Sequence, residues 1–267
     1  MAPQLINRPQ LKAEMRELLS YAQVSPKRMT ALYLGLDLVL ALIVFFVPAT
    51  GVFSTFLAVF RLLMSTVLFA GFTLYCMAIR RNERAEYLSL FDGFAFAGKL
   101  IALSIVMGAL IGLWTLAFII PGIITFYRYR FALFNLYENP DIGVLQALEM
   151  SKRQTLGYKG QLFSFDLSYL GWMLLADLPL LVESTLVSME QTAAILAGTT
   201  PVVSEFAVYS VLPSWGWLLV HGIWLLAVSV FYLPHKTCTE LGYFEIAKKT
   251  SGVGCTCDVQ TDDTDSV

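Results

Sequence analysis

The stretch FYRYRFALFNLY at residues 126–137 decides how this chain folds, because it places Arg128 and Arg130 in a run that is otherwise apolar and aromatic. It follows IIPG, which ends the preceding apolar run. The segment therefore either crosses a membrane or stays on the side where that run ends. The number of crossings, and the side on which every later segment lies, depend on this choice.

The composition favours a membrane protein over a soluble one. Of the 267 residues, 57% are apolar and only 14% are charged, whereas soluble domains carry about 25% charged residues. The net charge is −2 and no basic block occurs, so nucleic acid is not an expected partner. Residues 1–28 are polar and lack the apolar core of a cleavable signal peptide.

The apolar runs predict an all-α, polytopic integral membrane protein with six transmembrane helices and amphipathic cytoplasmic helices. A helix needs roughly 20 apolar residues to cross the hydrocarbon, and runs of about this length lie at 29–47, 52–79, 99–120, 121–137, 162–182 and 217–233. We therefore expect three regions. These are a cytoplasmic amphipathic segment at 1–28, a membrane domain at 29–249, and an acidic tail at 250–267 whose composition predicts disorder.

The basic residues support the crossing at 121–137. If this segment spans, the predicted inner side holds 15 of the 18 lysines and arginines, and the outer connections hold none. If it does not span, Lys152, Arg153 and Lys159 lie outside, against the usual excess of positive charge on the cytoplasmic side. We therefore predict a multi-pass protein of the cell membrane with both termini in the cytoplasm.

Six ionisable residues inside the predicted spans form a candidate buried-charge cluster: Asp37, Arg61, Arg128, Arg130, Asp166 and Asp177. An arginine at mid-bilayer costs about 2.5–3.5 kcal/mol on insertion scales, so such residues are usually paired, inward-facing or hydrated. Two hypotheses stay open. The residues line a polar path or a pocket for a charged ligand or lipid headgroup, or they form structural ion pairs that fix the helix registry. On regular helices, Arg128 and Arg130 would point apart, while Asp166 and Asp177 would share one face.

Two polar segments have amphipathic patterns. Residues 8–22 predict a short helix that lies either along the membrane or against the rest of the protein, since one stripe holds Leu11, Met15, Leu18 and Leu19. After Asn139-Pro140-Asp141, the run ALEMSKRQTLGYKG at 147–160 predicts a cytoplasmic helix. Its basic residues are a candidate face for lipid headgroups or for a cytosolic partner: Lys152, Arg153 and Lys159.

Motifs for catalysis and metal binding are missing. The sequence contains no H-E-x-x-H, G-x-S-x-G, P-loop or G-x-G-x-x-G motif, so we expect neither an enzyme nor a cofactor. Cys255 and Cys257 form a C-x-C pair that could bind a metal or carry a lipid. Because no further Cys or His lies nearby, this signal is weak and we expect no metal site.

Several stretches together resemble a known family: FDGFAFAGKLIAL (91–103), LWTLAFIIPGIITFYRYRFALFNLYENPDIGVLQALEMSKRQTLGYKG (113–160), LFSFDLSYLGW (162–172) and YLPHKTCTELGYFEIAK (232–248). They resemble an uncharacterised family of polytopic membrane proteins, a domain of unknown function found mainly in Gram-positive bacteria. That family looks related to the membrane domain of some glycerophosphodiester phosphodiesterases. The resemblance covers roughly residues 8–248 and implies an architecture rather than an activity. Two departures are Pro234-His235, where the family has Pro-Tyr, and the long acidic connection at 183–216.

These observations predict a non-enzymatic scaffold, adaptor or envelope-homeostasis component, with membrane lipids and a membrane or cytosolic protein as partners. The alternative is a transporter or permease for a small or lipid-derived solute, which would use Asp37, Arg128, Arg130 and Asp177. A membrane-embedded lipid enzyme is a third hypothesis, disfavoured by the missing motifs. No internal repeat is obvious, which counts mildly against a transporter built from inverted repeats.

Overall fold

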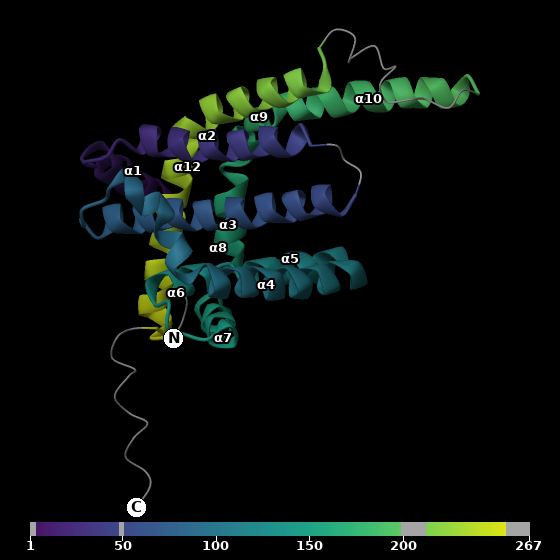
Figure 1. The fold of residues 1–267 in the computed structure, drawn as a ribbon. Coiled ribbons are helices and arrows are strands. Elements are labelled where there is room, and N and C mark those ends of the chain that lie inside the picture. The colour runs from purple at the N-terminus through teal and green to yellow at the C-terminus, as the bar shows by residue number, and fades with distance from the viewer. Residues whose placement is uncertain (1–3, 48–50, 199–211, 255–267) are drawn as a thin grey trace, which may run out of the picture. The chain divides into compact units, whose positions relative to one another are not determined.

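The computed structural model describes residues 4–47, 51–198 and 212–254. Within these ranges the regular elements are all helical, which confirms the predicted all-α class (Figure 1). The chain divides into two compact units. Unit 1 comprises residues 1–24, 66–168 and 235–267, and unit 2 comprises residues 25–65 and 169–234.

Four helical stretches are long and apolar enough to cross a membrane: α2 (Pro26–Phe45), α3 (Val52–Arg80), η1 with α4 (Tyr87–Ala117) and α12 (Ser214–Ser251). A fifth results if α9 (Leu170–Ala176) and α10 (Leu178–Leu196), which are bent by 62° to one another, are counted as one span. The chain thus has several candidate membrane helices. Among the described residues, the fourth predicted span, 121–137, is not a helix of spanning length.

A tight hairpin connects α4 (Ala97–Ala117) to α5 (Ile119–Arg128). Phe118 joins them in an extended conformation, with φ −159° and ψ 141°. The reversal therefore occurs just before the predicted Pro121-Gly122, which instead lies in the first turn of α5, where proline is tolerated. A Cβ atom on Gly122 would lie 2.2 Å from Thr115 Oγ1, so glycine is what lets the two helices approach this closely.

The predicted fourth span at 121–137 is interrupted. After α5 ends at Arg128, residues 129–131 are not helical, and α6 covers Ala132–Glu138. The 10 residues of α5 extend only about 15 Å, half of a hydrocarbon layer of about 30 Å. The expectation that Arg128 and Arg130 lie on one regular helix is therefore wrong, because Arg130 lies in the break.

The segment formed by α5 and α6 nevertheless runs back along α4 and ends beside the first turn of α4. The Nζ atom of Lys99, in the first turn of α4, donates a hydrogen bond to the carbonyl oxygen of Pro140 at 2.6 Å. Arg81, which follows α3, pairs with Glu138 at the end of α6 at 2.7 Å. Together, α5 and α6 thus cover the same length as α4 in the opposite direction.

The C-terminal half of α12 forms the core of unit 1. The residues from Thr237 to Phe244 are all buried, so this part of the helix is enclosed on every side. The ring of Phe244 packs edge-on against Phe131, with 5.5 Å between centroids. Tyr243 lies 5.3 Å from Phe165 of α8 (Lys159–Leu167). Segments that are distant in sequence therefore meet on this one helix.

Helix α1 (Arg8–Ser20) packs on this core through its predicted apolar stripe. Leu11, Met15 and Leu19 are buried. A Cβ atom on Gly242 of α12 would lie 2.9 Å from Leu11 Cδ1. Met15 Sδ accepts a hydrogen bond from Arg80 Nη1 at 2.6 Å. Of the two alternatives that the sequence left open for this helix, the structure has the packed one.

Unit 2 buries few side chains. Gly222 of α12 packs against Leu38 of α2, where an added Cβ atom would lie 2.3 Å from Leu38 Cδ1. Trp224 Nε1 donates a hydrogen bond to the carbonyl oxygen of Leu175 at 2.7 Å. Helix α10 has no buried residue at all. This unit presents a wide apolar surface, as expected for helices that face lipid.

Candidate functional site

Arg130 is the centre of a buried ion-pair cluster in unit 1. Its Nη1 and Nη2 atoms each donate to one carboxylate oxygen of Asp166, on α8, at 3.0 Å. Its Nε atom donates to Glu240 of α12. The side chains of Arg130 and Glu240 are each only 11% exposed. The guanidinium therefore ties the break after α5 to two other helices.

Neighbouring groups complete this cluster. The hydroxyl of Tyr127 donates to Asp166 Oδ2 at 3.0 Å, and Lys236 Nζ lies 4.0 Å from Asp166 Oδ1. The ring of Phe126 lies 5.1 Å from the guanidinium carbon of Arg130. Two cationic and two anionic side chains balance one another, and all three nitrogen atoms of the guanidinium donate hydrogen bonds. Removing one member of such a cluster would leave a buried charge without compensation.

Three of the other predicted charges lie in unit 2, where their ion pairs are longer. Arg61 Nη2 and Asp37 Oδ2 are 3.7 Å apart, and Ser65 donates a hydrogen bond to the other oxygen of Asp37. Asp177, at the bend between α9 and α10, lies 3.7 Å from His221 Nε2. The Arg61 side chain is 42% exposed, compared with 11% for Arg130. The candidate cluster is thus divided into three separate groups.

Arg128 stands apart from these groups. Its guanidinium lies 5.8 Å from the ring of Tyr129, and no ion pair to it occurs within the described ranges. Its carbonyl oxygen accepts hydrogen bonds from Ser151 at 2.9 Å and Thr155 at 3.1 Å. The two arginines of the 126–137 stretch therefore differ, since Arg130 is bound by its side chain and Arg128 is anchored by its backbone.

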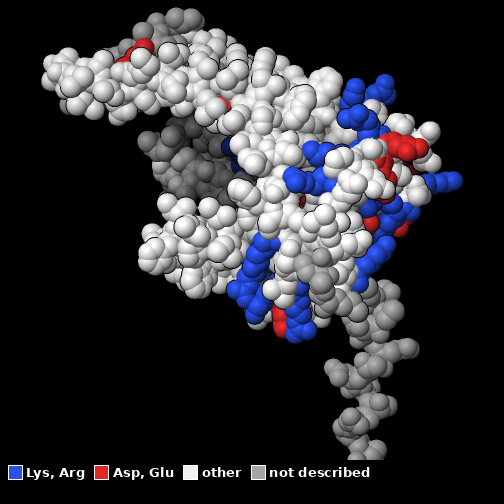
Figure 2. Space-filling model, turned by 180° about the vertical axis from the view of Figure 1, so that it is seen from behind, with Lys and Arg blue, Asp and Glu red and all other residues white. Residues whose placement is uncertain are grey.

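The predicted basic face lies on α7 (Val144–Gln154) and at the start of α8. Lys152 and Arg153 are exposed, and Arg153 forms an exposed ion pair with Glu149 of its own helix at 2.6 Å. Lys159 is the first residue of α8 and is half-exposed. Figure 2 shows lysines and arginines gathered together with acidic residues among them, and wide uncharged surface elsewhere. A role for these three residues in binding lipid or a partner stays a prediction.

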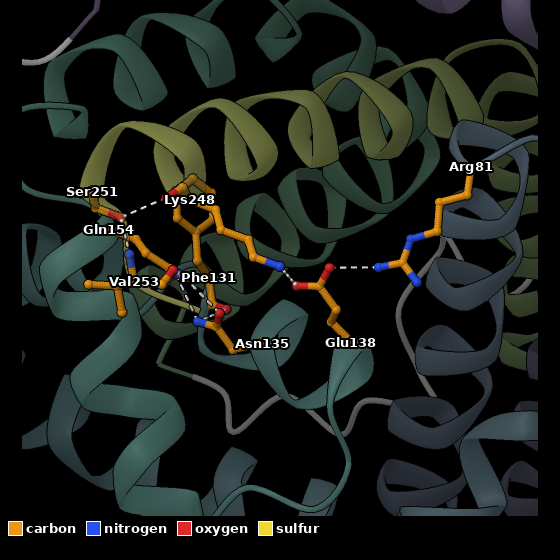
Figure 3. Close-up of polar contacts among 8 residues, drawn as sticks. All are labelled: Arg81, Phe131, Asn135, Glu138, Gln154, Lys248, Ser251 and Val253. Carbon is orange, nitrogen blue, oxygen red and sulfur yellow. Dashed lines mark hydrogen bonds and ion pairs between the residues drawn. The ribbon is translucent and has the colours of Figure 1, made fainter. Parts of the chain in front are cut away.

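A second polar network joins α6 to α3, α7 and the end of α12 (Figure 3). Glu138 lies between two cations, with Lys248 Nζ and Arg81 Nη2 each 2.7 Å from one of its oxygens. Next to it, the side-chain amides of Asn135 and Gln154 exchange two hydrogen bonds of 2.8 Å. The Gln154 amide also donates to the carbonyl oxygen of Val253 at 3.2 Å.

Glu240 is the main residue that the sequence analysis missed. It follows the last predicted span, 217–233, and so falls on the predicted inner side, where the sequence gives no reason to expect a buried partner. A signal was present, because Glu240, Phe244 and Ala247 follow one another at helical spacing on a single face. A carboxylate within such an apolar stripe indicates a buried cation, although the pattern does not say which one.

The described part of the chain offers no new candidate for a metal site. There, no group of three or more His, Cys, Asp and Glu residues could hold a metal ion. Cys76 and Cys238 are free and buried. Cys255 and Cys257 lie outside the described residues, as does most of the predicted acidic tail.

The fold defines a helical protein with several candidate membrane spans and a core of buried ion pairs. Residues 117–251, just over half of the chain, match the family described as "Protein of unknown function (DUF975)", and the chain belongs to this family. No curated protein and no solved structure matches it. The predicted membership of an uncharacterised family is thereby confirmed. The relation to phosphodiesterase membrane domains and the distribution among Gram-positive bacteria stay predictions.

Proposed function

We propose that this protein is a non-enzymatic scaffold or adaptor of the cell membrane, with a role in envelope homeostasis. The observation that carries the proposal is the Arg130 cluster. Its charges balance within the protein and its guanidinium is already bound by Asp166 and Glu240, so little capacity remains for a transported ion. The buried charges of unit 1 then serve to hold helices together.

We further propose six spans with cytoplasmic termini, the fourth being α5 and α6 together. The contact between Lys99 and Pro140 supports this topology, because the chain after α6 has returned to the start of α4. The break at residues 129–131 is tolerable inside a membrane when protein surrounds it. Here the backbone N–H of Phe131 is satisfied by Ser151 Oγ at 3.1 Å. The distribution of positive charge supports the same orientation.

The surface of α7 is the proposed site for a cytosolic partner. Its buried side carries Ala147, Leu148 and Ser151 and fixes the helix on unit 1, while Lys152 and Arg153 extend into solvent. A rigidly held helix with exposed charges suits recognition by an acidic protein surface, because little entropy is lost when it binds.

The test is purification in mild detergent from native membranes, followed by mass spectrometry of the proteins retained. The double variant Lys152→Glu/Arg153→Glu should lose a partner that wild type retains. The matched control Arg84→Glu reverses an exposed charge of the same unit outside α7, and it should retain the partner. A set of retained proteins that is identical in all three samples would contradict the adaptor proposal.

A transporter is the second candidate, and one observation in unit 2 favours it. Arg61 Nε is buried without a hydrogen-bond partner among the described residues, and the contact of Arg61 with Asp37 is long. Such a weakly satisfied charge pair is better suited to bind a solute than the Arg130 cluster. A small molecule that co-purifies with wild type and is lost from Asp37→Asn would place the transporter hypothesis first.

A further inference from the structure

A cavity of about 380 Å³ opens in unit 1 where α3, α6 and α12 end. Its volume falls within the range of ligand pockets, roughly 300–1,000 Å³. Nine residues line it: Met77, Arg80, Arg81, Glu138, Leu241, Phe244, Glu245, Lys248 and Lys249. Neither hypothesis for the function makes use of this cavity, which contains none of the predicted site residues.

The charges of the cavity do not cancel. Four of the lining residues are cationic and two are anionic, so the net charge is +2. Glu245 binds Arg80 through two hydrogen bonds. Glu138 is shared between Arg81 and Lys248 (Figure 3). Lys249 is exposed and forms no ion pair with any described residue. The cavity therefore attracts an anion that carries one or two charges.

The remaining lining is apolar. Met77, Leu241 and Phe244 are buried and supply the apolar part of the cavity lining. A small inorganic anion would leave this apolar part without a contact. A phosphate joined to a less polar group would use both parts, the phosphate with the cations and the attached group with the apolar side chains.

We propose that this cavity binds the phosphate of an anionic phospholipid headgroup. Arg80 is the last residue of a candidate span, and its two hydrogen bonds to Glu245 hold the end of α12, which carries Lys248 and Lys249, beside it. The cavity thus lies where α3 ends, near the membrane surface on the side that the charge distribution assigns to the cytoplasm. Basic pockets between spanning helices on that side bind lipid headgroups in this way. The inference rests on the proposed membrane location and is independent of the adaptor role.

Glu138 would regulate the strength of binding. It holds Arg81 and Lys248 at 2.7 Å each, and so it orients both cations while neutralising one of their charges. Loss of its charge should raise the net charge of the cavity from +2 to +3 and strengthen binding. This reversed sign separates a true site from simple damage, since a destabilised variant would not bind more lipid.

The experiment uses the full chain in nanodiscs of phosphatidylcholine with or without phosphatidylglycerol, and native mass spectrometry counts the anionic lipids that remain bound. Lys249→Gln should weaken retention about fivefold, and Arg81→Gln/Lys249→Gln more strongly, because each basic residue near a headgroup contributes a factor of about this size. Glu138→Gln should increase retention. Arg84→Gln, which removes an exposed charge outside both the cavity and the α7 face, is the matched control and should equal wild type.

A second arm distinguishes the source of the phosphate. Inorganic phosphate is added to the protein in a neutral detergent, and the thermal unfolding midpoint is measured for the same variants. Protection by phosphate that follows the order of the variants, without retention of phosphatidylglycerol, would show a site for free phosphate and overturn the lipid proposal. Equal retention by wild type, Lys249→Gln and Glu138→Gln would overturn the site itself, even if a protein partner is found at α7.

Discussion

Units 1 and 2 each contain an arginine among apolar helices, and the two arginines differ in how they are paired. In unit 1, Arg130 is bound by two carboxylates, with two of the hydrogen bonds at 3.0 Å, and is 11% exposed. In unit 2, Arg61 meets a single carboxylate at 3.7 Å and is 42% exposed. Charges among the apolar helices of one chain therefore need not share a role. We expect the fully satisfied pair to fix helices, and the partly satisfied one to be the better candidate for binding a ligand.

The largest effect should come from removing one partner of the Arg130 cluster. Asp166→Leu leaves a buried guanidinium with only Glu240, and removal of one member of a buried ion pair typically costs about 3–5 kcal/mol. We expect a loss of this size in the free energy of unfolding, measured by denaturant titration in mixed micelles. A loss below about 1 kcal/mol would show that the cluster does not hold unit 1 together.

An intermediate effect on the free energy of unfolding should come from adding a methyl group at a glycine, and its size should differ between the two units. A Cβ atom on Gly71 of α3 would lie 1.9 Å from the carbonyl oxygen of Leu90 in η1, so Gly71→Ala must displace backbone in unit 1. We expect a cost of about 1–3 kcal/mol. Gly35→Ala in α2 of unit 2 is the matched control, because nothing lies within 4 Å of its added Cβ atom.

The control should be neutral or slightly stabilising, since alanine favours helix over glycine by about 1 kcal/mol. Thermal unfolding of both alanine variants in the same detergent measures the difference. If Gly35→Ala were the more damaging of the two, the contrast between the close packing at Gly71 and the open space at Gly35 would be lost.

The smallest effect on stability should come from the charge pair of unit 2. Asp37→Asn retains a hydrogen-bond acceptor for Ser65, and the long side chain of Arg61 can extend toward the membrane surface. We expect a change below about 1 kcal/mol in the same titration. A loss as large as that of Asp166→Leu would make the two pairs equivalent and remove the structural argument for a ligand site at Asp37.

Part of this architecture could be predicted from local pattern. The helices α2, α3 and α4 follow from apolar runs of spanning length, and the buried stripe of α1 follows from its spacing. The break at residues 129–131 could not be predicted, because aromatic and apolar residues there permit a continuous helix. Arg130 lies in this break and pairs with Asp166 and Glu240, which are 36 and 110 residues further along the chain.

The apolar runs and their spacing thus predict that the chain is helical, that several of its helices suit a membrane, and that its buried charges need partners. These properties depend on the length and composition of single segments, which the transfer of residues from water into lipid sets directly. The local pattern does not say which charges meet or where the basic cavity opens. Both depend on which helices become neighbours around the C-terminal half of α12, since partners so distant along the chain come together only when the helices pack.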